Sequence, residues 1–372
     1  MIHLTGDISV VANRFHGLDF CRAVFMCLGL FFHCGLIYGA GQDWRVLSDE
    51  TLTLIKYIAN FIHHFRMEAF YLVSGFFYFL VYSKGREAFM KDRIYRALLP
   101  MLTVGLTINF LMNGLSYNRE YYWDIDYFLS GLWLGHLWFL GNLIVYFLIT
   151  KGVCQYISTR SNNISQIQFL WLIFMLLMLA LTGHILAKQF SLSTVVFINF
   201  GYLFYFYPFF LMGVLSCAAK PHFYQLIKIR LFPIYLVIYA GLQATAKIDI
   251  GLSDTHVDLL KMISHLPLML AAFAILNSIG DRESKLIRYV SEASYTIYLL
   301  HQPLIIVLYV AFFESIQLGA LVEYVMLITS VLGVSLLFHH YIVCKSHILE
   351  LLLNGVDRKQ NKPTLRVAIN TR

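Results

Sequence analysis

Long apolar stretches alternate with short polar connections along almost the whole chain. About ten of these stretches approach the 20 residues that an α-helix needs to cross the hydrocarbon core of a bilayer. The pattern therefore predicts an all-α, polytopic integral membrane protein with about ten transmembrane helices. We expect these helices near residues 18–40, 57–82, 97–113, 136–151, 167–186, 195–217, 231–246, 258–279, 289–312 and 320–344. The predicted parts of the chain are an N-terminal tail (1–17), a transmembrane domain (18–345) and a basic C-terminal tail (346–372).

The second stretch, from Phe61 to Phe79, is long and apolar enough to cross a membrane, yet it contains four ionisable residues. An ionisable group inside a membrane span costs at least a few kcal/mol, so such residues usually mark a site or pathway. At about 100° per residue, a helical wheel separates an apolar face from a polar one. We interpret the polar face as the lining of a cavity; the alternative is a set of buried ion pairs that only orient helices. This face holds His63, His64, Arg66, Glu68, Tyr71, Ser74 and Gly75.

Composition supports the membrane class, because 59% of the residues are hydrophobic and only 13% are charged, against about 25% charged in soluble domains. Of the 28 Lys and Arg residues, 21 fall in the tails and even-numbered connections, and only 6 in the odd-numbered ones. Positive residues favour the cytoplasmic side, so we expect both termini in the cytoplasm. The net charge of +7 then reflects topology, and we expect no nucleic-acid partner.

The six cysteines lie within or beside apolar segments and show no metal-ligand spacing. We expect them to be small buried hydrophobic residues, and we predict neither structural disulfides nor a metal site.

Three predicted helices bring ionisable groups to one depth in the outer half of the membrane. His33 lies in the first, Glu68 and its neighbours in the second, and His136 and Trp138 begin the fourth. A histidine there could act as a general base, since its usual pKa lies near neutrality. Glu68 could orient His64 or His33. The simpler alternative for His33 is a hydrogen bond to a neighbouring helix.

The densest basic patch on the predicted cytoplasmic side contains Lys91, Arg93 and Arg96. Arg93 and Arg96 are three residues apart, so they share one face of a helix. Guanidinium groups bind phosphate bidentately, which suits a phosphorylated ligand. Topology alone would also place basic residues in an inner connection.

Together these features resemble the membrane-bound acyltransferase family 3 over essentially the whole chain. The similarity extends to a subgroup that succinylates periplasmic glucans. The matching segments are the Arg14–Arg22 region leading to His33, FRMEAFYLVSGFF (Phe65–Phe77), Arg93 and Arg96 with Pro100, HLWFL (His136–Leu140), YPFFLMG (Tyr207–Gly213) and SYTIYLLHQPL (Ser294–Leu304).

The resemblance implies that an acyl-CoA donor binds from the cytoplasm and that a carbohydrate hydroxyl is acylated outside a bacterial inner membrane. His33 matches the family's essential histidine, and Arg93 and Arg96 match its paired-arginine motif. We therefore predict three sets of site residues. They are catalytic His33, Arg66 and Glu68; donor-binding Lys91, Arg93 and Arg96; and substrate-binding His63, His64, His136, Trp138 and His301.

The expected partners are acyl-CoA, a glycan acceptor and membrane lipids, and a homodimer is compatible with the sequence. Neither the acyl group, succinyl or acetyl, nor the glycan is fixed by these residues. The alternative function is a secondary transporter or flippase, whose polar residues would line a transport path. Such folds often contain repeated halves with broken helices, and the sequence shows no matching halves.

Overall fold

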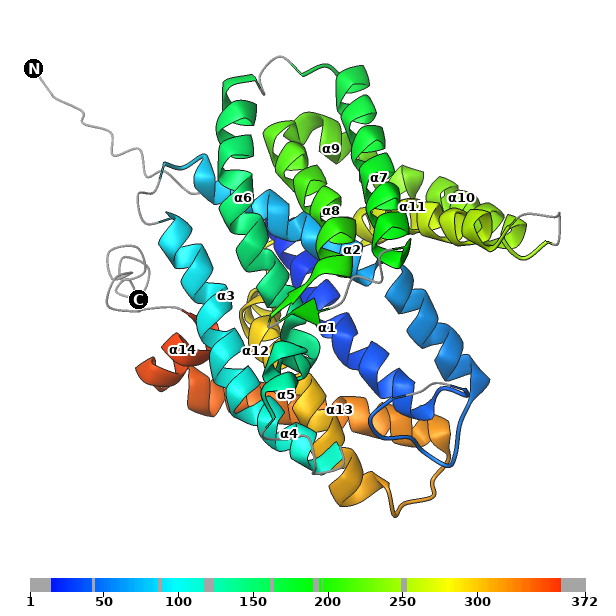
Figure 1. Ribbon diagram of the computed structural model, residues 1–372, viewed down its shortest axis with the longest axis vertical. Helices are drawn as coiled ribbons and strands as arrows, with labels where there is room; N and C mark the ends of the chain where they lie inside the picture. Colours follow the sequence, from blue (N-terminus) through cyan, green and yellow to red (C-terminus); the bar gives the residue numbers. More distant parts are fainter. Residues whose placement is uncertain are drawn as a thin grey trace, which may run out of the picture.

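The computed structural model describes residues 15–41, 44–85, 89–116, 124–160, 164–189, 194–195, 197–248 and 253–355. These residues form a bundle of helices of unequal length (Figure 1). The longer elements are α1 (His16–Tyr38), α2 (Thr53–Tyr82), α3 (Phe89–Leu106), α4 (Ile108–Ser116), α6 (Trp138–Arg160), α7 (Gln166–Gln189), α8 (Phe200–Ala218), α10 (Phe232–Thr245), α11 (Asp254–Gly280), α12 (Lys285–Leu308) and α13 (Ala320–Phe338). The shorter ones are α5 (Ile125–Leu129), η2 (Leu132–Leu137), α9 (Lys220–Leu226), η4 (Ile229–Leu231), η5 (Tyr309–Phe313), η6 (His339–Val343) and α14 (His347–Asn354).

Eight helical runs in the described residues are long and apolar enough to cross a membrane. A ninth is obtained if the bent pair α9 and η4–α10 forms one span, with a bend of 43°. Helix α2 is 30 residues long but is not among the eight, because Arg66 and Glu68 reduce its apolar character. The prediction of a largely helical, multi-pass membrane protein is confirmed. The number ten and the cytoplasmic side of the termini stay predictions.

Two short elements were not expected from the apolar pattern. A hairpin of two-residue strands, β1 (Thr194–Val195) and β2 (Ile198–Asn199), pairs antiparallel before α8. Helix α14 lies within the predicted C-terminal tail and packs against α3. It ends at Gly355, whose φ of +60° suits glycine. Residues 1–14 and 356–372 of the two predicted tails lie outside the described residues.

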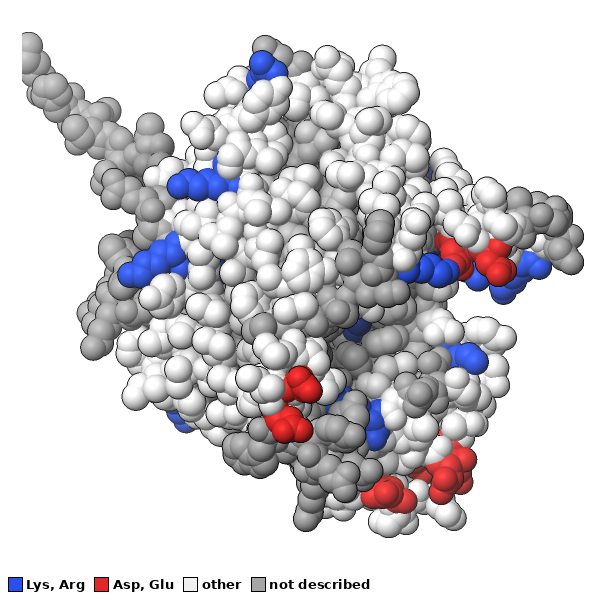
Figure 2. Space-filling view, in the orientation of Figure 1, with Lys and Arg blue, Asp and Glu red and all other residues white. Residues whose placement is uncertain are grey.

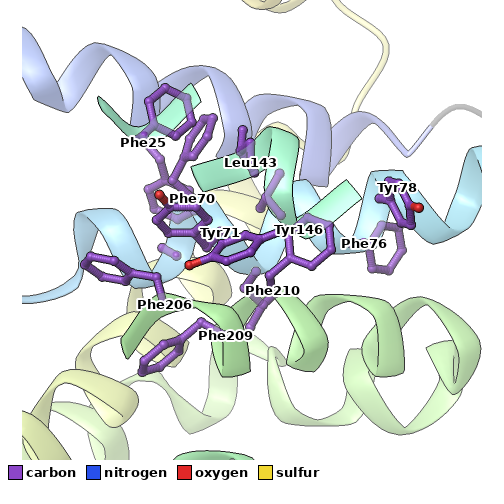
Figure 3. Close-up of a cluster of buried hydrophobic side chains, with 14 of the residues drawn as sticks. Phe25, Phe70, Tyr71, Phe76, Tyr78, Leu143, Tyr146, Phe206, Phe209 and Phe210 are labelled. Carbon is purple, nitrogen blue, oxygen red and sulfur yellow. The ribbon is translucent and has the colours of Figure 1, made fainter. Parts of the chain in front are cut away.

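An aromatic core joins α2, α6 and α8 (Figure 3). Tyr71 stacks on Phe206 with ring centroids 4.9 Å apart, and Tyr78 stacks on Phe147 at 5.3 Å. The Tyr78 hydroxyl also donates a hydrogen bond to the Phe147 carbonyl at 2.6 Å. Helices in lipid associate through packing and such hydrogen bonds, because lipid tails are as apolar as the side chains themselves. These contacts fix α2 at the centre of the bundle.

Two glycines let α2 and α8 approach closely. A Cβ added at Gly75 would lie 1.9 Å from the Phe210 carbonyl oxygen, and one at Gly213 would lie 1.9 Å from the Leu72 carbonyl oxygen. Small residues at such crossings allow helix backbones to touch. Tyr71 and Gly75 therefore serve helix packing, and the predicted polar face of this helix lines a cavity only in part.

Candidate active site

A cavity of about 850 Å³ lies among α1, α2, η2, α6, α7, α8, α11 and α12. Its volume is in the range of small-molecule binding sites. Among the described residues, its lining includes the Lys and Arg side chains of Arg45, Arg66 and Lys188 and one carboxylate, that of Glu68. Figure 2 shows a hollowed face with Lys or Arg side chains visible inside the hollow and acidic groups around it. Seven predicted site residues line the cavity: His33, His63, Arg66, Glu68, His136, Trp138 and His301.

Three histidines from three elements meet at this cavity. His33 comes from α1, His136 from η2 and His301 from α12. The ring centroids of His33 and His301 are 5.2 Å apart, and those of His136 and His301 are 4.8 Å apart. The sequence placed His33 and His136 at one depth, and the structure adds His301 to them.

Hydrogen bonds separate the roles of these rings. His301 Nδ1 lies 2.6 Å from the Tyr298 carbonyl oxygen and must donate to it, so in a neutral ring Nε2 carries the lone pair. That Nε2 atom and His33 Nδ1 are buried and have no hydrogen-bond partner among the described residues. In His136, by contrast, Nδ1 lies 2.8 Å from Gln302 Oε1 and Nε2 lies 3.2 Å from the Leu299 carbonyl. His33 and His301 can therefore exchange protons with a ligand, whereas His136 is held in place.

Arg66 is a buried cation directed at the same space. Its guanidinium lies over the Phe32 ring at 4.6 Å, and its buried Nε atom has no hydrogen-bond partner within the described ranges. Gly29 gives it room, because a Cβ there would lie 3.1 Å from Arg66 Nη1 and 3.4 Å from His301 Nε2. Among the described residues, Arg66 makes no ion pair within 4 Å. A buried guanidinium without a carboxylate is costly, so an anionic group in the cavity would stabilise it.

Glu68 is held by partners that the sequence interpretation did not name. Its Oε1 accepts a hydrogen bond from the Tyr205 hydroxyl at 2.8 Å and lies 2.9 Å from His265 Nδ1. Its Oε2 is buried, and no described residue forms a hydrogen bond with it. The bonded oxygen of Glu68 faces α8 and α11 rather than His33 or His64, and an orienting role toward those two histidines stays a prediction.

His64 does not belong to the cavity lining. Its Nδ1 lies 3.0 Å from the Tyr239 hydroxyl on α10, and its ring stacks on His265 with centroids 5.2 Å apart. The structure thus places it behind Glu68, among α2, α10 and α11, rather than against a bound substrate.

The connection between α1 and α2 covers the histidine cluster. Trp44 stacks on His33 with centroids 5.6 Å apart and planes inclined by 28°. The next residue, Arg45, lines the cavity and donates a hydrogen bond to Asn113 on α4. Trp44 therefore shields His33 on one side, which limits the approach of water to the ring.

The predicted donor-binding residues Lys91, Arg93 and Arg96 lie on α3, outside the cavity lining. Arg93 Nη2 donates to the Phe77 carbonyl at 3.1 Å, and Arg22 lies over the Phe77 ring at 5.0 Å. His33 lies eleven positions after Arg22 on α1, which corresponds to about 16 Å along the helix axis. The basic patch and the histidine cluster therefore lie near different parts of α1.

Several cavity residues escaped the sequence analysis, among them His184, His265, Tyr205 and Gln302. His184 and His265 carry the same signal as Glu68, an ionisable group inside an apolar stretch, and the rule for intramembrane charges would have found them. Tyr205 and Gln302 carry no such signal, since their roles depend on contacts between helices. Among the described residues, no three His, Cys, Asp or Glu side chains are placed to hold a metal ion.

Comparison with known proteins places this geometry in a class. The acyltransferase domain family (family 3) matches residues 15–340, so the chain belongs to that family and is a membrane acyltransferase. The resemblance inferred from the motifs is confirmed.

Among individual proteins, the chain is similar to glucans biosynthesis protein C of Escherichia coli O157:H7, of Escherichia coli K12 and of Shigella dysenteriae serotype 1. Each is 28% identical over 326 residues, which cover 79% of this chain and 83% of the relative. No solved structure matched the chain.

Proposed function

We propose that this acyltransferase transfers a succinyl or acetyl group from acyl-CoA, bound on the cytoplasmic side, to a hydroxyl of a glycan outside the inner membrane. One observation carries the proposal: His33 Nδ1 and His301 Nε2 are both buried, have no hydrogen-bond partner in the part of the chain that the structure describes, and face one cavity. Acyl transfer to a hydroxyl needs such a proton acceptor. The name of the relatives, glucans biosynthesis protein C, supports a glycan as the acceptor.

In the proposed reaction, His33 or His301 removes the proton of the acceptor hydroxyl while the hydroxyl oxygen attacks the carbonyl carbon of the thioester. The new C–O bond forms, the C–S bond breaks, and the imidazolium returns the proton to the departing thiolate. Arg66 is the cation available to stabilise the negative charge that develops on the carbonyl oxygen. His33 could instead carry the acyl group between donor and acceptor.

The acyl-CoA donor must extend from the basic patch on α3 to the histidine cluster. Arg93 and Arg96 would bind the phosphates of CoA, and the flexible arm of CoA would reach between helices toward His33, about 16 Å farther along α1. This route explains why the basic patch and the histidine cluster lie apart. It also requires no separate acyl-carrying domain.

Arg66 favours a succinyl over an acetyl group. Its buried guanidinium makes no ion pair with any described residue. The free carboxylate of a succinyl group would neutralise this positive charge, whereas an acetyl group has no carboxylate and would not. The proposal is thus more specific than acyl transfer alone.

The direct experiment is mass spectrometry of envelope glycans from cells with and without the gene, and from cells that produce His33→Ala. We expect an acyl group on the glycan that disappears in both deficient strains. The mass of the added group distinguishes succinyl from acetyl. Identical glycans in all three strains would disprove the proposal, and CoA-independent uptake of an unmodified solute into vesicles would favour a transporter.

A further inference from the structure

The cavity extends beyond the three histidines toward an opening between α7 and α11. His184 and Lys188 line both the main cavity and a second pocket of about 200 Å³. At this second pocket, Lys188 Nζ lies 2.9 Å from Asp258 Oδ2, and the two side chains are 67% and 40% exposed. Polar side chains therefore continue from the buried part of the cavity to the surface.

The buried end of this path has an unsatisfied acceptor. Glu68 is only 3% exposed, and its Oε1 is already bonded to Tyr205 and His265. Its Oε2 has no hydrogen-bond partner among the residues that the structure describes. An unsatisfied carboxylate oxygen in a buried site is costly, and a hydroxyl of a ligand in the cavity would satisfy it. Water could do the same, so the site needs a second feature that favours a particular ligand.

That feature is a group of aromatic rings that line the same cavity. The ring centroids of Trp138 and Tyr202 are 4.5 Å apart, and Phe206 lies 5.7 Å from Tyr202 and 6.1 Å from Trp138. All three residues line the cavity with Glu68. A sugar ring has both an apolar C–H face, which packs on aromatic rings, and an edge of hydroxyl donors. Water can donate a hydrogen bond but has no apolar face to pack on the aromatic rings.

We propose that Glu68, with Trp138, Tyr202 and Phe206, forms a binding subsite for a polyhydroxylated chain, and that this chain leaves the protein past Lys188 and Asp258. Tyr205 and His265 are positioning residues, since they hold Glu68 Oε1 and leave Oε2 for a sugar hydroxyl. The inference rests on the proposed function in one respect, because it takes the acceptor to be a glycan. It differs from the sequence interpretation in moving Glu68 from catalysis to acceptor binding.

The test measures sugar binding without any acyl donor. Linear gluco-oligosaccharides of increasing length are titrated into the purified full-length protein, and tryptophan fluorescence is recorded. We expect Glu68→Gln to weaken binding about tenfold to a hundredfold, the effect of losing a hydrogen bond to a charged group. The KM for the acyl donor should not change. Tyr205→Phe removes one of the two hydrogen bonds to Oε1 but keeps the bond from His265 and the carboxylate. It should therefore have a smaller effect, and it serves as the second variant if Glu68→Gln unfolds.

The exit path has its own test. Thr255→Trp adds a bulky side chain to the second pocket and should weaken the binding of long oligosaccharides while leaving the shortest unaffected. Thr329→Trp, exposed on α13 and outside both pockets, is the matched control and should bind all lengths as the wild type does. Equal effects of Thr255→Trp on all lengths would overturn the path.

The outcomes for the two proposals are separable. If Glu68→Gln binds sugar as tightly as the wild type, or if it changes only the donor KM, the subsite proposal fails while acyl transfer stands. If the wild type binds sugar but never acylates it, the proposed function fails while the subsite stands.

Discussion

At the scale of single residues, His301 has the clearest chemical state, because its Nδ1–H is held by the Tyr298 carbonyl. We expect His33→Ala and His301→Ala each to lower kcat by about 10²–10⁴-fold, the usual contribution of a positioned acid or base. The measurement is acyl-CoA consumption with an acceptor present, together with a thermal unfolding curve for each variant.

His340→Ala is the matched control, since His340 lies near Tyr289 and outside the cavity lining. If only one of the two cavity variants is inactive, that histidine is the base and the other positions a ligand. Full activity in both would remove the histidine pair from the mechanism.

Arg66 gives a second prediction at this scale. Arg66→Gln should lower succinyl transfer about 10–150-fold, because a hydrogen bond to a charged group contributes about 1.5–3 kcal/mol. Acetyl transfer should fall less, since an acetyl group has no carboxylate to bind. The ratio of the two activities is measured, and Lys56→Gln, on the same helix and outside the cavity lining, is the control. An unchanged ratio would show that Arg66 does not select the acyl group.

The sequence was most informative where an ionisable side chain lies within an apolar, membrane-spanning stretch. His33, His136 and Arg66 were predicted from ionisable groups in apolar stretches, and the cavity contains all three. His64 and Tyr71, on the same predicted polar face, are not in the cavity lining, because a helical wheel gives the direction of a side chain but not the element that it faces. Tyr71 faces α6 and α8, whereas His64 faces α10 and α11. Which helices surround α2 depends on contacts between residues far apart in the sequence, and the spacing of apolar residues does not reveal these contacts.

At the scale of elements, α2 and α8 cross closely at Gly75 and Gly213, and the same two helices carry Glu68 and Tyr205 of the cavity lining. Gly75→Ala forces a methyl group onto the Phe210 carbonyl and should destabilise the protein by about 1–3 kcal/mol, the usual cost of overpacking. Activity should fall with it, because Glu68 on α2 and Tyr205 on α8 must separate. The measurement is a shift in Tm of the detergent-solubilised protein.

Gly333→Ala, on α13, is the control for this prediction, because a Cβ there would meet no atom within 4 Å. We expect its Tm to stay at or above that of the wild type, since alanine favours helix over glycine. A Gly75→Ala protein with wild-type Tm and activity would contradict the role of the crossing.

At the scale of the whole molecule, the proposed donor and acceptor sites require opposite sides of the membrane. Reporters fused after residue 372 and inserted at Asp49 should therefore show cytoplasmic and extracytoplasmic locations, respectively. In vesicles of defined orientation, Arg93→Ala should raise the KM for acyl-CoA added to the cytoplasmic side. Lys84→Ala, an exposed change in the connection after α2, should not. Both reporters on one side would disprove transfer across the bilayer.

Helix α14 bears on how this protein is handled. A Cβ at Gly355 would lie 2.4 Å from the Cα of Arg96, so the end of the last described helix rests on the backbone of a proposed donor-binding arginine. Truncation before residue 347 would expose the surface of α3 that α14 covers, and a bulky affinity tag joined directly at residue 355 would press on the same surface. A loss of activity in a shortened or tagged protein can therefore come from the disturbed α3 surface, and it does not show that the C-terminal tail takes part in the reaction. Tags belong after residue 372, where 17 residues separate them from Gly355.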